Sequence, residues 1–194
     1  MPAPPERQAD PPQPHAAPRG PAVRLVAAID RLNRWAGRLA GWALVLMLIL
    51  GCWNVFGRYA GLLLGTNLSS NGLIEAQWYL FAFAFLLGLG WTLQRQGHVR
   101  VDVLQSRWPE RRRLGVDLAG TLGLLLPFVA LVLIVSAAPT IESWRIAEAS
   151  PDPGGLPRFW VKALIPLGFL LLGLQGVAEA IRLALQRRTL RRRR

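Results

Sequence analysis

Polar residues at the borders of long apolar stretches are the first candidates for chemistry. Asn54 and Arg58 are four residues apart, on one helical face near the end of the first stretch, and Glu75 lies at the start of the second. A short connection joins these ends, so Arg58 and Glu75 could meet as an ion pair. The alternative is local, with Glu75 near a helix N-terminus that Ser70 or Asn71 caps. A third interpretation gives Glu75 a coupling-ion or substrate role, because ionisable groups near membrane depth are usually paired or functional.

A second candidate group lies between the second and third apolar stretches, where Asp102 follows His98 by four residues. A histidine beside an aspartate could form a catalytic dyad, but nothing nearby supplies a nucleophile. Leu104 and Trp108 could share one helical face instead. The segment therefore predicts a short interfacial arm helix that ends near Pro109, which can open the next helix.

A third group follows the third apolar stretch. Glu148 and Asp152 belong to a segment rich in proline and glycine, Glu148–Pro157, which predicts a rigid, turn-rich loop. Such a loop either only connects two helices or presents a docking surface. Gln175 is a polar residue within the last apolar stretch and is a candidate for a subunit interface.

Several kinds of site are excluded by the residue inventory. Cys52 is the only cysteine, and neither of the two histidines, His15 and His98, lies within an apolar stretch. A membrane haem held by paired histidines is therefore excluded. The sequence has no phosphate-binding glycine loop, metal-ligand cluster or catalytic triad. We expect no enzyme activity and no cofactor.

The charge distribution indicates a membrane protein. The formal net charge is +12, and 18% of residues are charged, against about 25% in a typical soluble domain. Charge is absent from long blocks and dense between them. Because the basic residues cluster beside apolar stretches, the positive-inside rule explains them better than nucleic-acid binding does.

Hydropathy predicts an all-α membrane protein with four transmembrane helices and short interfacial amphipathic arm helices. The four spans are expected at about 39–59, 73–93, 114–138 and 159–183, within a membrane domain covering 39–185. Each has the ~20 residues that cross ~30 Å of hydrocarbon.

The flanking segments differ in composition from the membrane domain. Residues 1–21 are rich in proline and alanine and are expected to form a disordered cytoplasmic tail. Residues 22–38 show helical periodicity, which predicts either an amphipathic helix in the headgroup region or an extension of the first span. Residues 186–194 form a basic cytoplasmic tail.

Arginine placement predicts the orientation. The head, the segment between the second and third spans, and the tail are rich in arginine, whereas the 60–72 loop has no charge and the 140–158 loop is mixed in sign. Basic segments stay on the cytoplasmic side. Both termini are therefore expected in the cytoplasm, with these two loops outside.

Small residues recur at four-residue spacing in the last two spans. They are Gly115, Ala119 and Gly123 in the third span, and Gly176, Ala180 and Ala184 in the fourth. Such spacing lets helices approach closely. Packing within this four-helix unit is the preferred interpretation, and a docking face for another subunit is the alternative.

Three segments resemble a known family, the small (DctQ-type) membrane subunit of tripartite ATP-independent periplasmic (TRAP) transporters. They are Asn54–Tyr59; Gly97–Asp102, with Glu75 before it; and Glu148–Pro157, followed by Lys162–Phe169 and Leu174–Gln175. With the span count, the resemblance covers about 32–182. The third segment resembles a subgroup often linked to 2-oxo acids and related carboxylates.

The resemblance implies a stationary scaffold in a bacterial inner membrane. A large multi-spanning subunit would carry an organic acid with sodium, and a periplasmic binding protein would deliver it, while this chain anchors the complex among membrane lipids. Two other functions compete. One is a self-sufficient four-span exporter that acts as a homodimer with Glu75 as a proton-coupled carboxylate, and the other is a redox anchor.

Overall fold

The chain forms four long helices in the parts that the structure describes. The structure is a computed structural model, and it describes residues 20–66, 68–97 and 108–192. The helices are α1 (Pro21–Leu64), α2 (Asn71–Gln94), α4 (Glu110–Gly120), η1 (Thr121–Leu125), α5 (Leu126–Arg145) and α6 (Phe159–Arg192). Because α4, η1 and α5 run on without a break, they make one rod. All four rods are long and apolar enough to cross a membrane, so the described residues confirm the predicted all-α class and contain four candidate spans, the number predicted.

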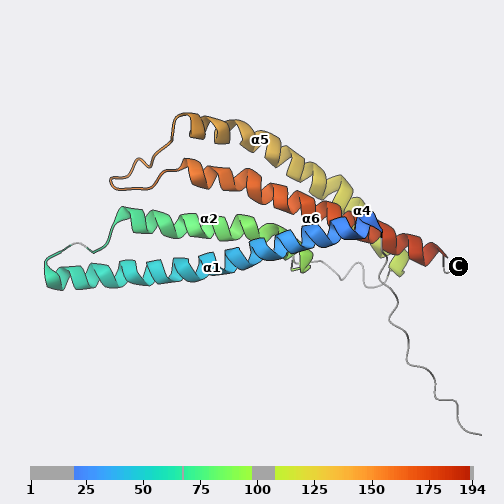
Figure 1. Ribbon diagram of the computed structural model, residues 1–194, viewed down its shortest axis with the longest axis horizontal. Coiled ribbons are helices and arrows are strands. Elements are labelled where there is room, and N and C mark those ends of the chain that lie inside the picture. Colours follow the sequence, from blue (N-terminus) through green and yellow to red (C-terminus); the bar gives the residue numbers. More distant parts are fainter. Residues whose placement is uncertain (1–19, 67, 98–107, 193–194) are drawn as a thin grey trace, which may run out of the picture.

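The rods form two hairpins that lie side by side (Figure 1). One hairpin joins α1 to α2, and the other joins α5 to α6, with both connecting loops at the same end of the molecule. We call this the hairpin end, and the opposite end, where α1 begins and α6 finishes, the terminal end. Helix α6 contacts every other rod, so it is the central element of the fold.

Helix α1 includes both residues 22–38 and the first predicted span. It runs for 44 residues without interruption. Pro21 opens it at the first turn, where a missing N–H costs nothing. Gly65 ends it in the left-handed region, at φ 68°, with its N–H bonded to the carbonyl of Gly61. The arm helix expected before Pro109 lies in residues 98–107, outside the described residues.

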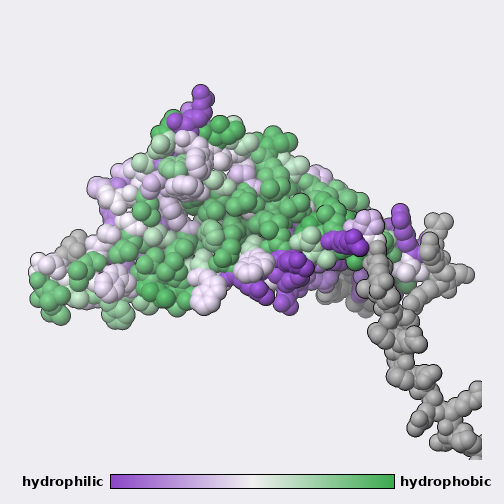
Figure 2. Space-filling model, viewed as in Figure 1, coloured by the Kyte–Doolittle hydropathy of each residue, from purple (hydrophilic) through white to green (hydrophobic). Residues whose placement is uncertain are grey.

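Small residues allow α1 to pack closely on its neighbours. Ala40 and Ala43 of α1 are buried against Ala84 of α2, and Ala36 is buried beside Leu87 and Leu171. Close approach maximises dispersion contacts, which drive helix association where lipid offers no hydrophobic driving force. Large apolar side chains instead cover the outside, and Figure 2 shows them spread over the middle of the visible face, with hydrophilic side chains toward the terminal end.

The small-residue stripes of the last two spans pack only in part within the unit. A Cβ on Gly176 would meet Leu125 and Leu126 at 3.1–3.2 Å, so this glycine supports close packing of η1 and α5 on α6. Gly123 faces open space. The π-helical turn η1 precedes Pro127, and the N–H of Leu126 bonds to the carbonyl of Thr121, five residues back. A proline lacks the N–H that would continue the α pattern, which explains the altered turn.

Candidate functional site

The loop between α5 and α6 is fastened to α2 by Glu75. This side chain is only 3% exposed, and its carboxylate accepts hydrogen bonds from the Ser150 hydroxyl and from the backbone N–H of Leu156. One turn further along α2, the Tyr79 hydroxyl donates to the carbonyl of Leu156 at 3.2 Å. At the start of α2, the Asn71 side chain donates to the carbonyl of Pro153 at 3.1 Å. Helix α2 therefore supplies a row of side chains that fixes the loop.

An ion pair between Arg58 and Glu75, one of the three possibilities for these residues, is not present in the structure. Arg58 is exposed on α1, and no ion pair joins it to Glu75 among the described residues. The loop brings a hydroxyl and an N–H directly to the Glu75 carboxylate, so both of its oxygens are already occupied. The helix-capping alternative is correct for Ser70, whose hydroxyl accepts from the N–H of Leu73 at 3.3 Å.

Gly155 lets the loop come this close to α2. A Cβ at this position would lie 2.4 Å from the Cβ of Ser150 and 2.8 Å from a carboxylate oxygen of Glu75. Both contacts are too short for any side chain. The glycine is therefore required by the close approach of the loop to the carboxylate.

Glu148 anchors the start of the same loop. Its carboxylate accepts from the Ser143 hydroxyl at 2.7 Å and from the Lys162 ammonium, and its carbonyl accepts from the N–H of Arg158 at 2.8 Å. The hydrogen bond from Lys162, and then that from Ser143, hold the pKa of the Glu148 carboxyl below its usual range. Asp152, the other predicted residue of this loop, has an exposed side chain.

A second polar cluster joins α1 to α6 toward the terminal end. Asn33 and Gln175 are fully buried, and the Asn33 amide donates to the Gln175 carbonyl oxygen at 2.8 Å. The Gln175 amide donates to Asp30 at 3.1 Å, and the Arg182 guanidinium binds both oxygens of Asp30. Arg182 also donates to Glu179 at 2.8 Å. This series of hydrogen bonds links α1 to α6 through residues that are more than 140 positions apart in sequence.

Sequence reasoning identified Gln175 but missed Asp30, Asn33 and Glu179. A signal was available, because Asp30 and Asn33 are three residues apart on the face of α1 that also buries Ile29 and Ala36. Gly90 of α2 faces this cluster, since a Cβ there would lie 2.0 Å from the Asn33 carbonyl oxygen. The three helices therefore meet at one crowded point.

Of the remaining predicted residues, the structure describes Asn54, which joins neither cluster. Asn54 is buried on α1, and its carbonyl oxygen has no hydrogen-bond partner among the described residues. His98 and Asp102 lie outside the described residues. Within the described part of the chain, no three histidine, cysteine or acidic side chains gather where they could hold a metal ion.

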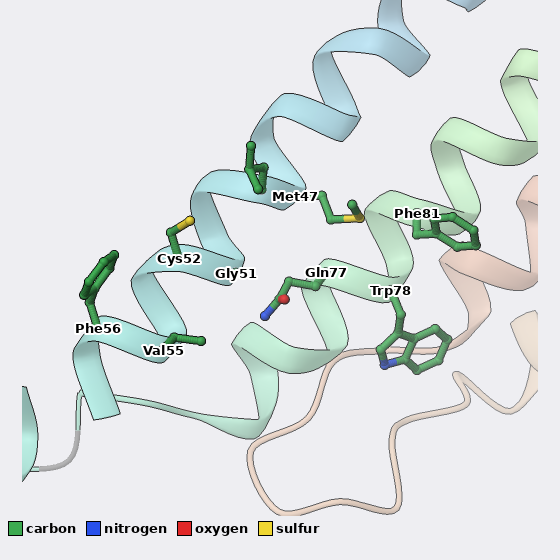
Figure 3. A pocket seen from close by; sticks show the side chains of 9 residues that line it. Met47, Gly51, Cys52, Val55, Phe56, Gln77, Trp78 and Phe81 are labelled. Carbon is green, nitrogen blue, oxygen red and sulfur yellow. The ribbon is translucent and has the colours of Figure 1, made fainter. Parts of the chain in front are cut away.

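An apolar groove separates α1 from α2 in the half of the hairpin nearer to its loop. It has a volume of about 630 Å³ and is lined by α1 residues between Met47 and Phe56 and by Gln77, Trp78 and Phe81 of α2. Figure 3 shows Gln77 reaching from α2 toward α1 beside Gly51. Cys52, the free cysteine, is exposed in this groove.

Comparisons with known proteins match most of this chain to one family. Residues 47–186 match the family described as tripartite ATP-independent periplasmic transporters, DctQ component. The chain is also 28% identical over 131 residues to the ectoine TRAP transporter small permease protein TeaB of Halomonas elongata, a match that covers 66% of this chain. The chain spans 63% of the length of that relative. No solved structure matches.

Proposed function

Since this chain belongs to the DctQ family, the small permease component of TRAP transporters, we propose that it is the scaffold for a large, sodium-coupled permease subunit. It is a multi-pass membrane component of a transporter and not an enzyme. In this proposal, a periplasmic binding protein delivers an organic acid, the large subunit carries it across the inner membrane, and this chain anchors that subunit among the lipids.

The placement of the polar clusters carries the proposal. The buried polar contacts of the described residues gather at two levels, around Glu75 and Glu148 at the hairpin end and around Asn33 and Gln175 toward the terminal end. Most polar groups in both clusters have partners within the chain, but the buried carbonyl oxygen of Asn33 has none among the described residues. A subunit that moved a charged substrate would need polar groups facing an open path, whereas clusters bonded mainly within the chain suit a rigid support.

The alternative function, a self-sufficient exporter, requires Glu75 to exchange protons with solvent. Its carboxylate is instead covered by the loop, with the Ser150 hydroxyl and the Leu156 N–H on its oxygens. This geometry favours a structural role for Glu75.

We place both termini in the cytoplasm and the hairpin end in the periplasm. Support comes from arginines at the terminal end, among them exposed Arg31, Arg34 and Arg38 on α1 and Arg111–Arg113 at the start of α4. A fluorescent protein fused to the C-terminus is expected to fluoresce, whereas a periplasmic reporter enzyme at the same place is expected to be inactive. The reverse pattern would overturn the orientation.

Co-purification from bacterial membranes tests the scaffold function. The chain is tagged, extracted in mild detergent and analysed for what elutes with it. We expect a larger multi-spanning protein in equal amount. A homo-oligomer without any partner would refute the scaffold function. Glu75 would then be the first residue to test as a transport carboxylate.

Uptake by the purified complex then tests the substrate. The complex is reconstituted with its binding protein, and sodium-dependent uptake of labelled 2-oxo acids is compared with uptake of ectoine, which the relative's name specifies. Uptake of an organic acid, competed poorly by ectoine, is the expected result. Uptake of ectoine alone would refute the substrate class and leave the scaffold function intact.

A further inference from the structure

Arg58, at the end of the first span, is an exposed charged side chain without a partner among the described residues. A guanidinium is protonated under all physiological conditions. No hydrogen bond or ion pair reaches it from any described residue, and the loop already occupies the oxygens of Glu75. An arginine near membrane depth normally has an anionic partner. We therefore expect the anionic partner of Arg58 to lie outside this chain.

The groove between α1 and α2 begins one turn before Arg58 on α1 and extends from there toward the terminal end. Arg58 follows Val55 by three residues and Gly51 by seven, and both line the groove, so the three residues share one face of α1. Tyr59 follows the lining residue Phe56 by three residues and is 66% exposed. A guanidinium and a phenol therefore stand at the mouth of the groove.

The groove has the depth of one membrane leaflet. From Met47 to Phe56 it follows α1 for nine residues, or about 14 Å at 1.5 Å per residue. Half of a hydrocarbon core that is ~30 Å thick is ~15 Å. Toward the terminal end the groove closes, because Ala40 and Ala43 pack against Ala84 there.

We propose that this groove binds one phospholipid of the leaflet at the hairpin end, with an acyl chain between α1 and α2 and the phosphate on Arg58. Guanidinium and phosphate form charge-assisted, bidentate hydrogen bonds, and the phenol of Tyr59 supplies another donor. An acyl chain fits a groove that is one leaflet deep and closed at the membrane centre, whereas a partner's transmembrane helix would continue through both leaflets.

Native mass spectrometry of the complex, extracted from bacterial membranes in mild detergent, tests the proposal. The complex is dissociated in the gas phase, and the lipid is read on the mass of this chain itself. The result is therefore independent of whether the large subunit co-purifies. One phospholipid per wild-type chain is expected.

Three variants probe the two parts of the site. Arg58→Gln removes the charge. We expect roughly tenfold lower lipid occupancy, because the loss of a hydrogen bond to a charged group weakens binding about tenfold or more. Cys52→Trp fills the groove and is expected to lower occupancy with Arg58 intact. Arg58→Lys keeps the charge and should retain an intermediate amount. The matched control is Arg145→Gln, an exposed arginine at the same end but away from the groove, which should leave occupancy unchanged.

Two outcomes would overturn the proposal. One is lipid occupancy in Arg58→Gln and Cys52→Trp equal to that of the wild type, because the lipid would then lie elsewhere on the chain. The other is a lipid-free wild-type chain in which Cys52 forms cross-links to the large subunit, because a protein helix would then occupy the groove.

Discussion

Substitution of Gly90 by alanine tests the crowded point where α1, α2 and α6 meet. The added Cβ would lie 2.0 Å from the Asn33 carbonyl oxygen and 3.0 Å from the backbone carbonyl oxygen of Leu171. Ordinary contact begins near 3.4 Å, so the Asn33 oxygen would have to retreat by about 1.4 Å. That movement would disrupt the 2.8 Å hydrogen bond between Asn33 and Gln175.

The expected cost combines strain with a lost hydrogen bond. Overpacking a close contact costs about 1–3 kcal/mol, and a buried hydrogen bond contributes about 1 kcal/mol. Replacing glycine by alanine in a helix returns about 1 kcal/mol. The net destabilisation of Gly90→Ala is therefore about 1–3 kcal/mol.

Gly88 provides a matched control on the same helix. A Cβ at Gly88 meets nothing within 4 Å, so Gly88→Ala should be neutral or stabilise the chain by up to about 1 kcal/mol. The assay is reversible unfolding of the purified chain in detergent micelles by SDS titration, followed by circular dichroism. Equal stability of the two alanine variants would refute the close contact. Combining Gly90→Ala with Asn33→Ala should cost less than the sum of the single variants, because the double variant removes the clashing oxygen.

The other predictions concern the two polar clusters. Asn33→Leu and Gln175→Leu should each destabilise the chain in the same unfolding assay. Their double-mutant cycle should give a coupling free energy of about 0.6–1.7 kcal/mol, as for other hydrogen bonds between membrane helices. Additive effects of the two substitutions would contradict the hydrogen bond. Because the pKa of Glu148 is lower in the folded chain than its ordinary value of about 4.5, the ionised carboxylate stabilises the folded loop. This stabilisation is complete above pH 4.5 and is lost as the pH falls through the pKa of the folded chain. Hydrogen exchange of the loop, corrected for intrinsic rates, should therefore stay slow down to about pH 4.5 and rise below it in the wild type. Glu148→Gln should show no such pH dependence, and an identical profile in both proteins would count against the pairing. Glu75→Ala should speed proteolysis within the α5–α6 loop, because two hydrogen-bond donors of the loop lose their acceptor. The control Glu142→Ala, which changes an exposed carboxylate, should not speed it. Equal rates of proteolysis in the two variants would show that Glu75 does not hold the loop.

The membrane helices were readable from the sequence because length and apolar composition decide whether a segment can cross a bilayer. The predicted second span, 73–93, lies within α2, and the predicted fourth span, 159–183, begins where α6 begins. The extension of α1 was less certain, because an amphipathic pattern fits both a helix lying on the membrane and one that continues a span. The family was also readable, since the resemblance to DctQ components is confirmed by the match over residues 47–186.

The partners of the polar side chains were decided only by the tertiary structure. Glu75 was correctly singled out as a polar residue at the border of a span, but its partners proved to be Ser150 and Leu156 in a distant loop. Likewise, nothing in the local sequence joined Asn33 to Gln175, more than 140 residues away. Hydropathy determines which segments enter the membrane. The rotation of each helix and the path of each loop determine which side chains meet, and these depend on close contacts such as Gly90 against Asn33 and Gly155 against Ser150.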